Sequence, residues 1–327
     1  MTLRSRPCRS VPKPAARQQL IGNSIPIRKL KRNISKMAMA DLPVLITGET
    51  GTGKELAARM LHAQSARASG PFIAVNCPAL PSDLFQAELF GYEKGAFTGA
   101  VERHAGRIAS AQGGILFLDE VGDMPLSVQA VLLRFLEDGR FERLGGARSI
   151  QADVRVLAAT HIDLDQAVAK GSFREDLYYR LKPLHLHTPP LRVRGPDKLL
   201  LAEHFVEQCC RKLGLRRHVI TEEAIATILD YHWPGNIREL RNSIQQAVVL
   251  CKHHELSCRD LNVKFSATES RSANGTSLKS RRLAAERSAI ESALEISGGC
   301  VNAAAQYLEV SRAQLYRLIK AHNINMP

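Results

Sequence analysis

Long hydrophobic runs are missing from this chain of 327 residues. No apolar stretch approaches the ~18 residues that mark a membrane-spanning helix, and none follows the basic N-terminus, as a signal peptide would require. Aromatic residues make up only 5% of the chain, but 45% of it is hydrophobic, which is enough for a sizeable core. We therefore expect a soluble, cytoplasmic protein of two or three domains.

Paired cysteines are also missing. The seven cysteines include no CxxC pair, so the pattern indicates no disulfide framework and fits a reducing cytoplasm. Cys251, His253, His254 and Cys258 crowd together, but their spacing matches no common zinc pattern. We interpret them as ordinary residues near the end of a helix.

Acidic residues are absent from residues 1–36, which hold ten lysines and arginines. The simpler interpretation is a solvated basic tail, and the alternative is non-specific contact with phosphates. The whole chain has a net charge of +13. That charge favours an anionic partner such as nucleic acid, but it says nothing about the fold.

Composition divides the chain into five segments. Residues 1–17 are rich in proline and arginine and are predicted to be disordered. Residues 18–190 alternate short apolar strands with amphipathic helices, as α/β proteins do, and residues 191–263 are predicted to be helical. Residues 264–280 have the serine, threonine, asparagine and glycine content of a linker. Helical periodicity returns in residues 281–327.

A glycine-rich turn follows directly on the predicted strand at residues 44–47 and leads into a helix, which is the context of a phosphate-binding loop. Its glycines let backbone N–H groups converge on phosphate oxygens, and the helix N-terminus adds partial positive charge. Lys54 can reach the β and γ phosphates of a nucleotide, whereas Glu55 stands where serine or threonine usually holds Mg²⁺. The candidate loop residues are Gly48, Glu49, Thr50, Gly51, Thr52, Gly53, Lys54 and Glu55.

A second apolar strand, within residues 113–120, ends in two acids. Such a strand is typical of the centre of an α/β sheet, and its carboxyl end lies where these sheets bind ligands. Asp119 can hold Mg²⁺, and Glu120 can act as the base that polarises the attacking water. A third strand, residues 154–160, ends in Thr160, whose hydroxyl could sense the γ-phosphate.

Residues 95–100 read GAFTGA, a flexible loop of small residues whose single aromatic suits a contact better than a core. With GETGTGKE, NCPAL, ELFGYEKGAFTGA, GGILFLDE, VRVLAATH, FREDLYYRL and WPGNIREL, the chain closely resembles the bacterial enhancer-binding proteins, the sigma-54-dependent activators among AAA+ ATPases. The resemblance covers about residues 18–263 and continues into the C-terminal region. It implies an α/β P-loop fold with a parallel sheet, flanking helices and a helical lid. It also implies contact with sigma-54 through Gly95, Ala96, Phe97, Thr98, Gly99 and Ala100.

The resemblance implies roles for the residues at matching positions. Lys54 would bind phosphate, Asp119 would serve Mg²⁺ and Glu120 would activate water in ATP hydrolysis. Glu55 is the usual residue of the family at its position. The missing serine or threonine therefore does not argue against a Mg²⁺ site. The remaining positions are Asn76, which holds the catalytic glutamate in check, Thr160 and Arg238 as the two sensors, and Ile21 with Gly22 in the adenine pocket.

Two arginines are implied to reach the ATP of a neighbouring subunit, namely Arg174 and Arg180. Arginine suits this task because its guanidinium is always charged and pairs with phosphate oxygens. From the residues alone, ordinary surface ion pairs with Glu175 or Asp176 are the simpler interpretation. If the resemblance holds, the active site is shared, and hydrolysis requires a ring of subunits, expected to be a hexamer.

The C-terminal region has the pattern of a helix-turn-helix. Helices are predicted for residues 281–297 and 301–308, and a third for 312–321 with Ser311 as its N-cap. A helical docking module would share this pattern, but the stretch also resembles Fis-type modules, which bind palindromic DNA as dimers. The predicted DNA-contacting residues are Ser311, Arg312, Gln314, Tyr316, Arg317 and Lys320.

The sequence thus favours an ATP-dependent activator that binds upstream DNA and opens promoter complexes of sigma-54 polymerase. Two alternatives stay open: a DNA-binding AAA+ regulator that works without sigma-54, and a generic AAA+ remodelling enzyme with a helical adaptor. About 17 residues precede the ATPase region, too few for a folded sensor. Control is then expected from a separate protein, from expression level or from DNA binding, unless the chain is truncated.

Overall fold

The computed structural model describes residues 20–79, 82–251, 254–261 and 263, and in the C-terminal region residues 290, 293, 297, 301–308 and 310–321. The chain divides into two compact units, Met1–Asn262 and Val263–Pro327. The predicted tail and linker, and most of the helix expected at residues 281–297, lie outside the described residues.

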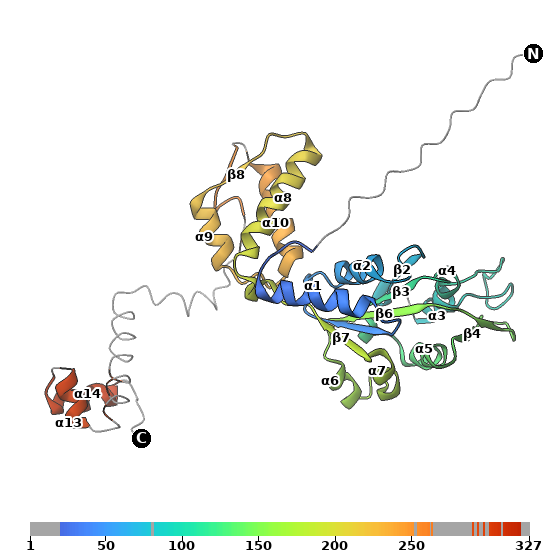
Figure 1. Ribbon diagram of the computed structural model, residues 1–327, viewed down its shortest axis with the longest axis horizontal. Helices are drawn as coiled ribbons and strands as arrows, with labels where there is room; N and C mark the ends of the chain where they lie inside the picture. The colour runs from blue at the N-terminus through green and yellow to red at the C-terminus, as the bar shows by residue number, and fades with distance from the viewer. Residues whose placement is uncertain are drawn as a thin grey trace, which may run out of the picture. The chain divides into compact units, whose positions relative to one another are not determined.

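A five-stranded parallel sheet forms the centre of the first unit (Figure 1). All of its strand pairs are parallel, so the carboxyl ends of the strands share one edge. The strand order is β2 (Phe72–Asn76), β3 (Ile115–Asp119), β6 (Arg155–Thr160), β1 (Val44–Thr47) and β7 (Leu184–His187).

Helices cover both faces of this sheet, and the alternation of side chains along β3 shows why. Ile115 and Phe117 pack into a core with α1 (Ile25–Ala38) and α2 (Lys54–Gln64). Leu116 and Leu118 pack into the opposite core with α3 (Ser82–Phe90), α4 (Arg107–Ser110), α5 (Leu126–Asp138) and α7 (Glu175–Leu181). The prediction of a strand buried on both sides is confirmed. The connecting elements are η1 (Cys77–Ala79), η2 (Val121–Asp123), β4 (Arg140–Glu142), β5 (Ser149–Gln151), α6 (Leu164–Ala169) and η3 (Leu191–Arg194).

A buried arginine ties α1 to the sheet. Arg155, the first residue of β6, is 4% exposed and donates to the carbonyl oxygens of Met37 (2.9 Å) and Leu42 (3.0 Å). Carbonyls at the end of a helix lack partners within the helix, and a cation there also complements the helix dipole. Arg155 therefore satisfies the end of α1.

The rest of the first unit is helical. It contains α8 (Asp197–Leu213), α9 (Glu222–Asp230) and α10 (Asn236–Leu250), with a short parallel pair of β8 (Val219–Ile220) and β9 (Glu255–Leu256). Trp233 is fully buried between α9 and α10, and its indole N–H donates to the Ile228 carbonyl at 2.9 Å. The turn that leads into α10 is thereby held in place.

The described part of the second unit contains two helices, α13 (Val301–Tyr307) and α14 (Arg312–Ala321). Ser311 caps α14, since its hydroxyl oxygen accepts from the Gln314 N–H at 3.2 Å, as the sequence predicts. Ala304 and Ala305 of α13 and Leu315 and Ile319 of α14 form a small apolar core with Ile290 and Ala293.

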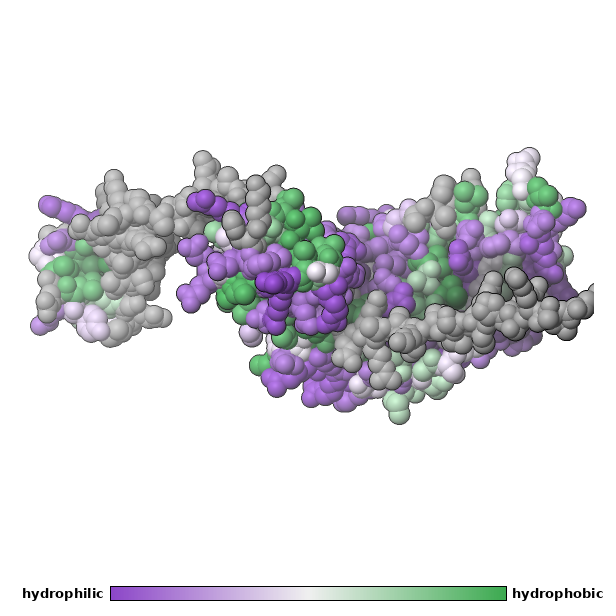
Figure 2. Space-filling model, turned by 90° about the horizontal axis from the view of Figure 1, so that it is seen from above, coloured by the Kyte–Doolittle hydropathy of each residue, from purple (hydrophilic) through white to green (hydrophobic). Residues whose placement is uncertain are grey.

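The described surface is mostly polar, with separate apolar patches on the face seen in Figure 2. Val101 (74% exposed) and Leu250 (66%) are among the apolar residues that reach solvent. Scattered apolar residues are ordinary on folded proteins, so this pattern alone identifies no partner. Within the described residues, no helix has the length and apolar character to cross a membrane.

Candidate functional site

The carboxyl edge of the parallel sheet gathers the polar residues of the candidate site. β1 runs directly into the glycine-rich loop, and Thr47 lies beside Thr160 at the end of β6. Asn76, the last residue of β2, lies beside Asp119 at the end of β3. Residues that are far apart in the sequence thus meet at the edge where α/β sheets bind ligands.

The glycine-rich loop has a backbone that only glycine adopts easily. Gly48, Gly51 and Gly53 have φ angles of 150°, 80° and 99°, in the region that L side chains rarely occupy. A Cβ at Gly48 would collide with Thr188, and one at Gly51 would collide with the Gly235 carbonyl. The loop then leads into α2, whose first residue is Lys54, so the helix N-terminus points into the site as the sequence predicts.

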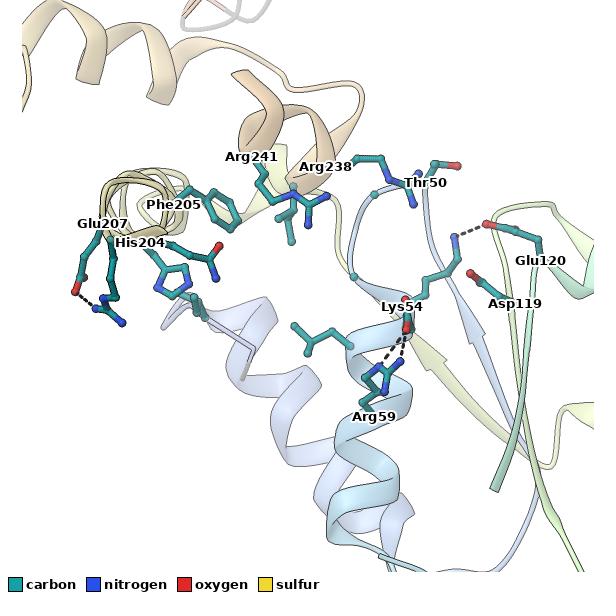
Figure 3. Close-up of a pocket in the computed structure, with 18 residues that line it drawn as sticks. Thr50, Lys54, Arg59, Asp119, Glu120, His204, Phe205, Glu207, Arg238 and Arg241 are labelled. Atoms are coloured by element: carbon teal, nitrogen blue, oxygen red, sulfur yellow. Dashed lines mark hydrogen bonds and ion pairs between the residues drawn. The ribbon is translucent and has the colours of Figure 1, made fainter. Parts of the chain in front are cut away.

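Lys54 is the cation at the centre of the site. Its side chain is 6% exposed, and Nζ donates to the Gly48 carbonyl at 3.0 Å. The same Nζ lies 3.1 Å from Oε1 of Glu120 (Figure 3). The lysine and the second acid of the β3 end, both predicted as site residues, are therefore in direct contact.

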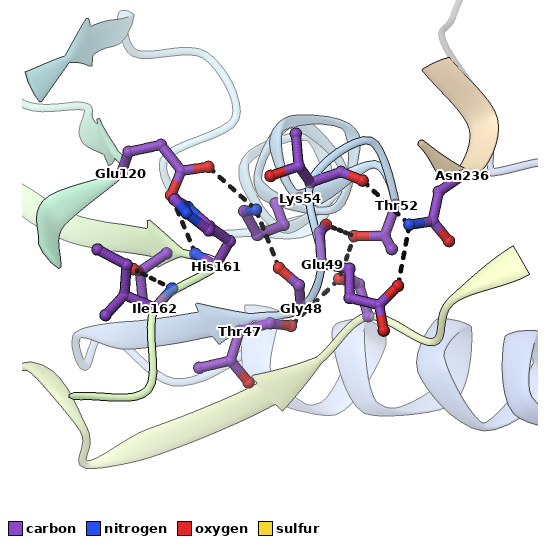
Figure 4. Close-up of polar contacts among 12 residues, drawn as sticks. Thr47, Gly48, Glu49, Thr52, Lys54, Glu120, His161, Ile162 and Asn236 are labelled. Atoms are coloured by element: carbon purple, nitrogen blue, oxygen red, sulfur yellow. Dashed lines mark hydrogen bonds and ion pairs between the residues drawn. The ribbon is translucent and has the colours of Figure 1, made fainter. Parts of the chain in front are cut away.

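Glu120 is held at both carboxylate oxygens. Oε1 faces Lys54, whereas Oε2 accepts from the backbone N–H of His161 (2.9 Å) and contacts its ring Nδ1 (2.6 Å) (Figure 4). The residue has a left-handed backbone, with φ 55° and ψ 52°, which is uncommon for a residue other than glycine. His161 follows Thr160, and polar groups at this strand end could by position sense the γ-phosphate, but its contact with Glu120 was not predicted from the sequence.

The two acids have opposite pKa shifts. Burial, reinforced by the neighbouring charge of Glu120, raises the pKa of the Asp119 carboxyl. Burial also works to raise the pKa of Glu120, but hydrogen bonds from His161 and the charge of Lys54 outweigh it and hold that pKa below its usual range. Glu120 is therefore ionised in this arrangement at neutral pH and can accept a proton.

A cavity of about 770 Å³ opens between the carboxyl edge of the sheet and helices α8 and α10 (Figure 3). The predicted residues Ile21, Thr50, Gly51, Gly53, Lys54, Glu55, Asp119, Glu120 and Arg238 line it. From α8 and α10, the lining also includes His204, Phe205, Gln208, Arg211, Ile237 and Arg241. Its size is within the range of small-molecule sites, and its lining combines cations with four acids, Glu55, Asp119, Glu120 and Glu207.

Asn236 joins the loop to the helical part, a link that sequence reasoning missed. Its Nδ2 donates to the Thr50 carbonyl (3.0 Å) and to Oε2 of Glu49 (3.1 Å) (Figure 4). Its Oδ1 accepts from the Leu191 N–H at 2.7 Å. Glu49 also forms a two-pronged ion pair with Arg192, at 2.6 and 2.7 Å. The start of α10, which carries Arg238, is therefore fastened to the glycine-rich loop.

Eight residues predicted for the nucleotide site do not line the cavity in this single chain, namely Gly22, Gly48, Glu49, Thr52, Asn76, Thr160, Arg174 and Arg180. The Thr160 hydroxyl is fully buried and accepts from the Ile162 N–H at 3.0 Å. Arg174 is exposed and pairs with Asp176 at 2.7 Å, which is the simpler arrangement considered from the sequence. Arg180 is also exposed and donates to a carbonyl of α5.

The GAFTGA segment forms a short loop of its own. The Gly95 N–H donates to the Ala100 carbonyl at 2.9 Å, which closes the loop, and Gly95 and Gly99 have positive φ angles in open space. Phe97 is 38% exposed, and the edge of its ring contacts Tyr92 at a centroid distance of 4.9 Å. The prediction of an exposed aromatic is confirmed, with Tyr92 as its support.

The predicted DNA-contacting residues surround the start of α14. The side chains of Ser311, Arg312, Gln314 and Arg317 are exposed, while Leu315 of the same helix is buried. The side chains of Tyr316 and Lys320 lie outside the described residues. The described part of α14 therefore leaves an arginine-bearing polar face uncovered within its unit.

Three family models match consecutive parts of the chain. The sigma-54 interaction domain matches residues 20–187, the AAA+ ATPase lid domain residues 192–278, and the bacterial regulatory protein, Fis family, residues 283–322. Together the three matches extend from residue 20, ahead of the glycine-rich loop, to residue 322, beyond the last described helix.

Curated relatives and solved structures agree with this assignment. The chain is 44% identical to the anaerobic nitric oxide reductase transcription regulator NorR of Enterobacter sp. (strain 638), over 93% of this chain and 63% of that protein. It is 47% identical to the DNA-binding transcriptional regulator NtrC of Escherichia coli (strain K12), over 74% of this chain and 52% of that protein. The crystal structure of NtrX from Brucella abortus in complex with ATP matches with a TM-score of 0.74 and 32% identity, over 94% of this chain and 70% of that one. The chain thus spans about half to two thirds of the curated relatives that it matches.

Proposed function

The chain belongs to the family of sigma-54-dependent transcriptional activators, and we propose that it hydrolyses ATP to open promoter complexes of RNA polymerase carrying sigma-54. It would bind DNA upstream of the promoter through its second unit. Tethering of this kind raises the local concentration of the activator at its target without any new contact.

ATP is the substrate that the cavity fits best. The glycine backbone of the loop, with its positive φ angles, leaves room for phosphate oxygens against the N-terminus of α2, and Lys54 and Arg238 supply positive charge. Ile21 and Phe205 give the same cavity an apolar portion, which suits a purine base. The structure of NtrX with bound ATP supports this proposal.

The Asp119 carboxylate lines the cavity and is a suitable ligand for Mg²⁺. The ion prefers oxygen ligands and usually keeps several waters, with one or two carboxylates and the substrate phosphates completing its shell. Asp119 lines the cavity next to Lys54 and is the residue that would hold the ion. When bound, Mg²⁺ would neutralise charge on the phosphates.

Hydrolysis follows from the contacts of Lys54 and Glu120. On ATP binding, Nζ of Lys54 would exchange Oε1 of Glu120, 3.1 Å away, for phosphate oxygens. That oxygen of Glu120 is then free to accept a proton from the attacking water. The lowered pKa of Glu120 keeps it ionised and ready for this step.

Completion of the site requires a second subunit. Arg174 and Arg180 lie outside the cavity of their own chain and are exposed, as residues that serve a neighbour must be. We propose that they reach the phosphates of the adjacent subunit in a ring, where an arginine can accelerate phosphoryl transfer by about 10³-fold or more.

The GAFTGA loop is proposed to transmit the motion to sigma-54. Thr98 and Gly99 are exposed, and the positive φ angles of Gly95 and Gly99 leave the loop free to change shape. Phe97 would leave Tyr92 to make the contact. The exposed arginines of α14 would meanwhile hold upstream DNA.

One observation supports this proposal above all: the Glu120 carboxylate lies 3.1 Å from the phosphate-loop lysine Lys54, in the same chain as a GAFTGA loop whose Phe97 and Thr98 are exposed. The test is the ATPase rate of the purified full chain as a function of its concentration, together with capture of sigma-54. We expect turnover per subunit to rise as rings assemble, and sigma-54 to be retained by the protein with ADP–aluminium fluoride but not by Thr98→Ala. A chain that hydrolyses no ATP at any concentration would refute the proposal.

A further inference from the structure

The two oxygens of the Glu120 carboxylate have different partners. Oε1 faces Nζ of Lys54 at 3.1 Å, on the side of the phosphate loop. Oε2 faces away from that loop and accepts from two groups of one residue, the backbone N–H (2.9 Å) and the ring Nδ1 (2.6 Å) of His161 (Figure 4). This carboxylate is therefore oriented, and the orientation comes from the end of the neighbouring strand.

The contact between the Glu120 carboxylate and Nδ1 of His161, at 2.6 Å, has a testable consequence for the ring. A carboxylate that is to act as the base accepts hydrogen bonds, so our proposal makes Nδ1 of His161 the donor. The His161 side chain is 43% exposed, whereas that of Glu120 is 18% exposed. His161 is thus no part of the apolar core, and its ring makes its polar contact with the acid that we propose as the base.

Asn76, for which the resemblance implies control of the catalytic glutamate, does not share this contact in the described chain. It is exposed at the end of β2, beside Asp119, and no hydrogen bond joins it to Glu120 among the described residues. His161 follows β6, which is the direct neighbour of β3. Its backbone and side chain therefore both reach Glu120.

We propose that His161 is a positioning residue for ATP hydrolysis. By holding Oε2 of Glu120, it keeps Oε1 directed at the phosphate side, where the attacking water must lie. This inference rests on the proposed ATPase function. His161 touches neither nucleotide nor water in this account and acts only through Glu120.

Substitution of His161 by asparagine or by glutamine distinguishes a role of Nδ1 from a role of Nε2. In asparagine the amide nitrogen is the same number of bonds from Cα as Nδ1 of histidine, whereas in glutamine it lies one bond farther, close to Nε2. We expect His161→Asn to keep kcat within about twofold of the wild type. His161→Gln and His161→Ala should each lower it roughly tenfold, which corresponds to ~1.4 kcal/mol of activation free energy.

A second measurement separates positioning from a general disturbance of the site. The Kd for ATP of all three variants should stay within about twofold of the wild type, because the lost bond acts on the base and not on the nucleotide. Nitrogen-15 NMR of histidine-labelled full chain should show a ring protonated at Nδ1 whose signal is missing from His161→Asn. His232→Ala, a change at an exposed histidine of the helical part, is the matched control and should leave both constants unchanged.

The outcomes separate this inference from the function on which it rests. An active wild type with an unchanged kcat in His161→Ala would overturn the positioning role, and so would equal losses in the asparagine and glutamine variants. A His161 ring protonated at Nε2 and not at Nδ1 would also contradict it. A wild type without any ATPase activity would instead refute the proposed function, and the inference with it.

Discussion

Removal of the Asn236 side chain should loosen the link between the glycine-rich loop and the helical part. The residue is fully buried, and its Oδ1 accepts from the Leu191 N–H at 2.7 Å. In Asn236→Ala that N–H loses its partner, and a buried unsatisfied donor costs about 1–3 kcal/mol. The backbone of Asn236 is left-handed, with φ 53°, which costs alanine roughly another 1–2 kcal/mol. We therefore expect the free energy of unfolding to fall by about 2–5 kcal/mol.

A glycine at the same position separates the two contributions. Asn236→Gly loses the same hydrogen bonds but adopts a positive φ without strain. Its free energy of unfolding should therefore lie above that of Asn236→Ala by about 1 kcal/mol. Asn242→Ala changes an exposed asparagine of the same helix and should stay within about 0.5 kcal/mol of the wild type.

Urea unfolding followed by tryptophan fluorescence suits this test. Trp233 is the only tryptophan of the chain, is fully buried, and lies three residues before Asn236. The slope with urea should be unchanged while the midpoint falls. If Asn236→Ala unfolds at the same urea concentration as the wild type, the hydrogen bonds of the Asn236 side chain contribute nothing to the free energy of unfolding. A glycine variant less stable than the alanine variant would contradict the role assigned to the backbone.

Three further predictions concern activity. Glu120→Gln should bind ATP with near-normal Kd but lose about 10²–10⁴-fold in kcat, because the amide cannot accept the proton of the water; near-normal turnover would exclude it as the base. Arg174→Ala should lose about 10³-fold in the turnover of assembled rings. Rings mixed from Arg174→Ala and Glu120→Gln subunits should recover activity, because some sites then combine an intact Glu120 of one subunit with an intact Arg174 of its neighbour. Thr98→Ala should hydrolyse ATP within about twofold of the wild-type rate, since its loop does not line the cavity, but should fail to open promoters; normal opening would favour action without sigma-54.

The strands and the phosphate loop could be predicted because their causes are local. A strand such as Ile115–Asp119 is apolar on both faces, which by itself indicates the centre of a doubly covered sheet. The glycines of the loop are spaced for a phosphate-binding turn, and the structure gives them positive φ angles, which glycine adopts easily. Lys54, Asp119 and Glu120 then meet because parallel strands end at one edge.

The links between distant residues could not be predicted in this way. His161 contacts Glu120 across 41 positions, and Asn236 contacts Glu49 across 187. Neither pair has a local pattern, because the contact depends on how neighbouring strands and the helical part pack. The contact of Thr160 is local but was also not indicated by its position at a strand end: the residue is fully buried, and its hydroxyl accepts from the Ile162 N–H.

The central claim is that ATP hydrolysis by this chain opens promoters of sigma-54 polymerase, and transcription with purified components tests it most directly. Permanganate reactivity of the DNA would report opening on a sigma-54 promoter, with the full chain and either ATP or a non-hydrolysable analogue. The account predicts opening with ATP, none with the analogue, and none with ATP when Glu120→Gln replaces the wild type. Opening with the analogue, or a closed promoter with ATP and an active ATPase, would contradict it.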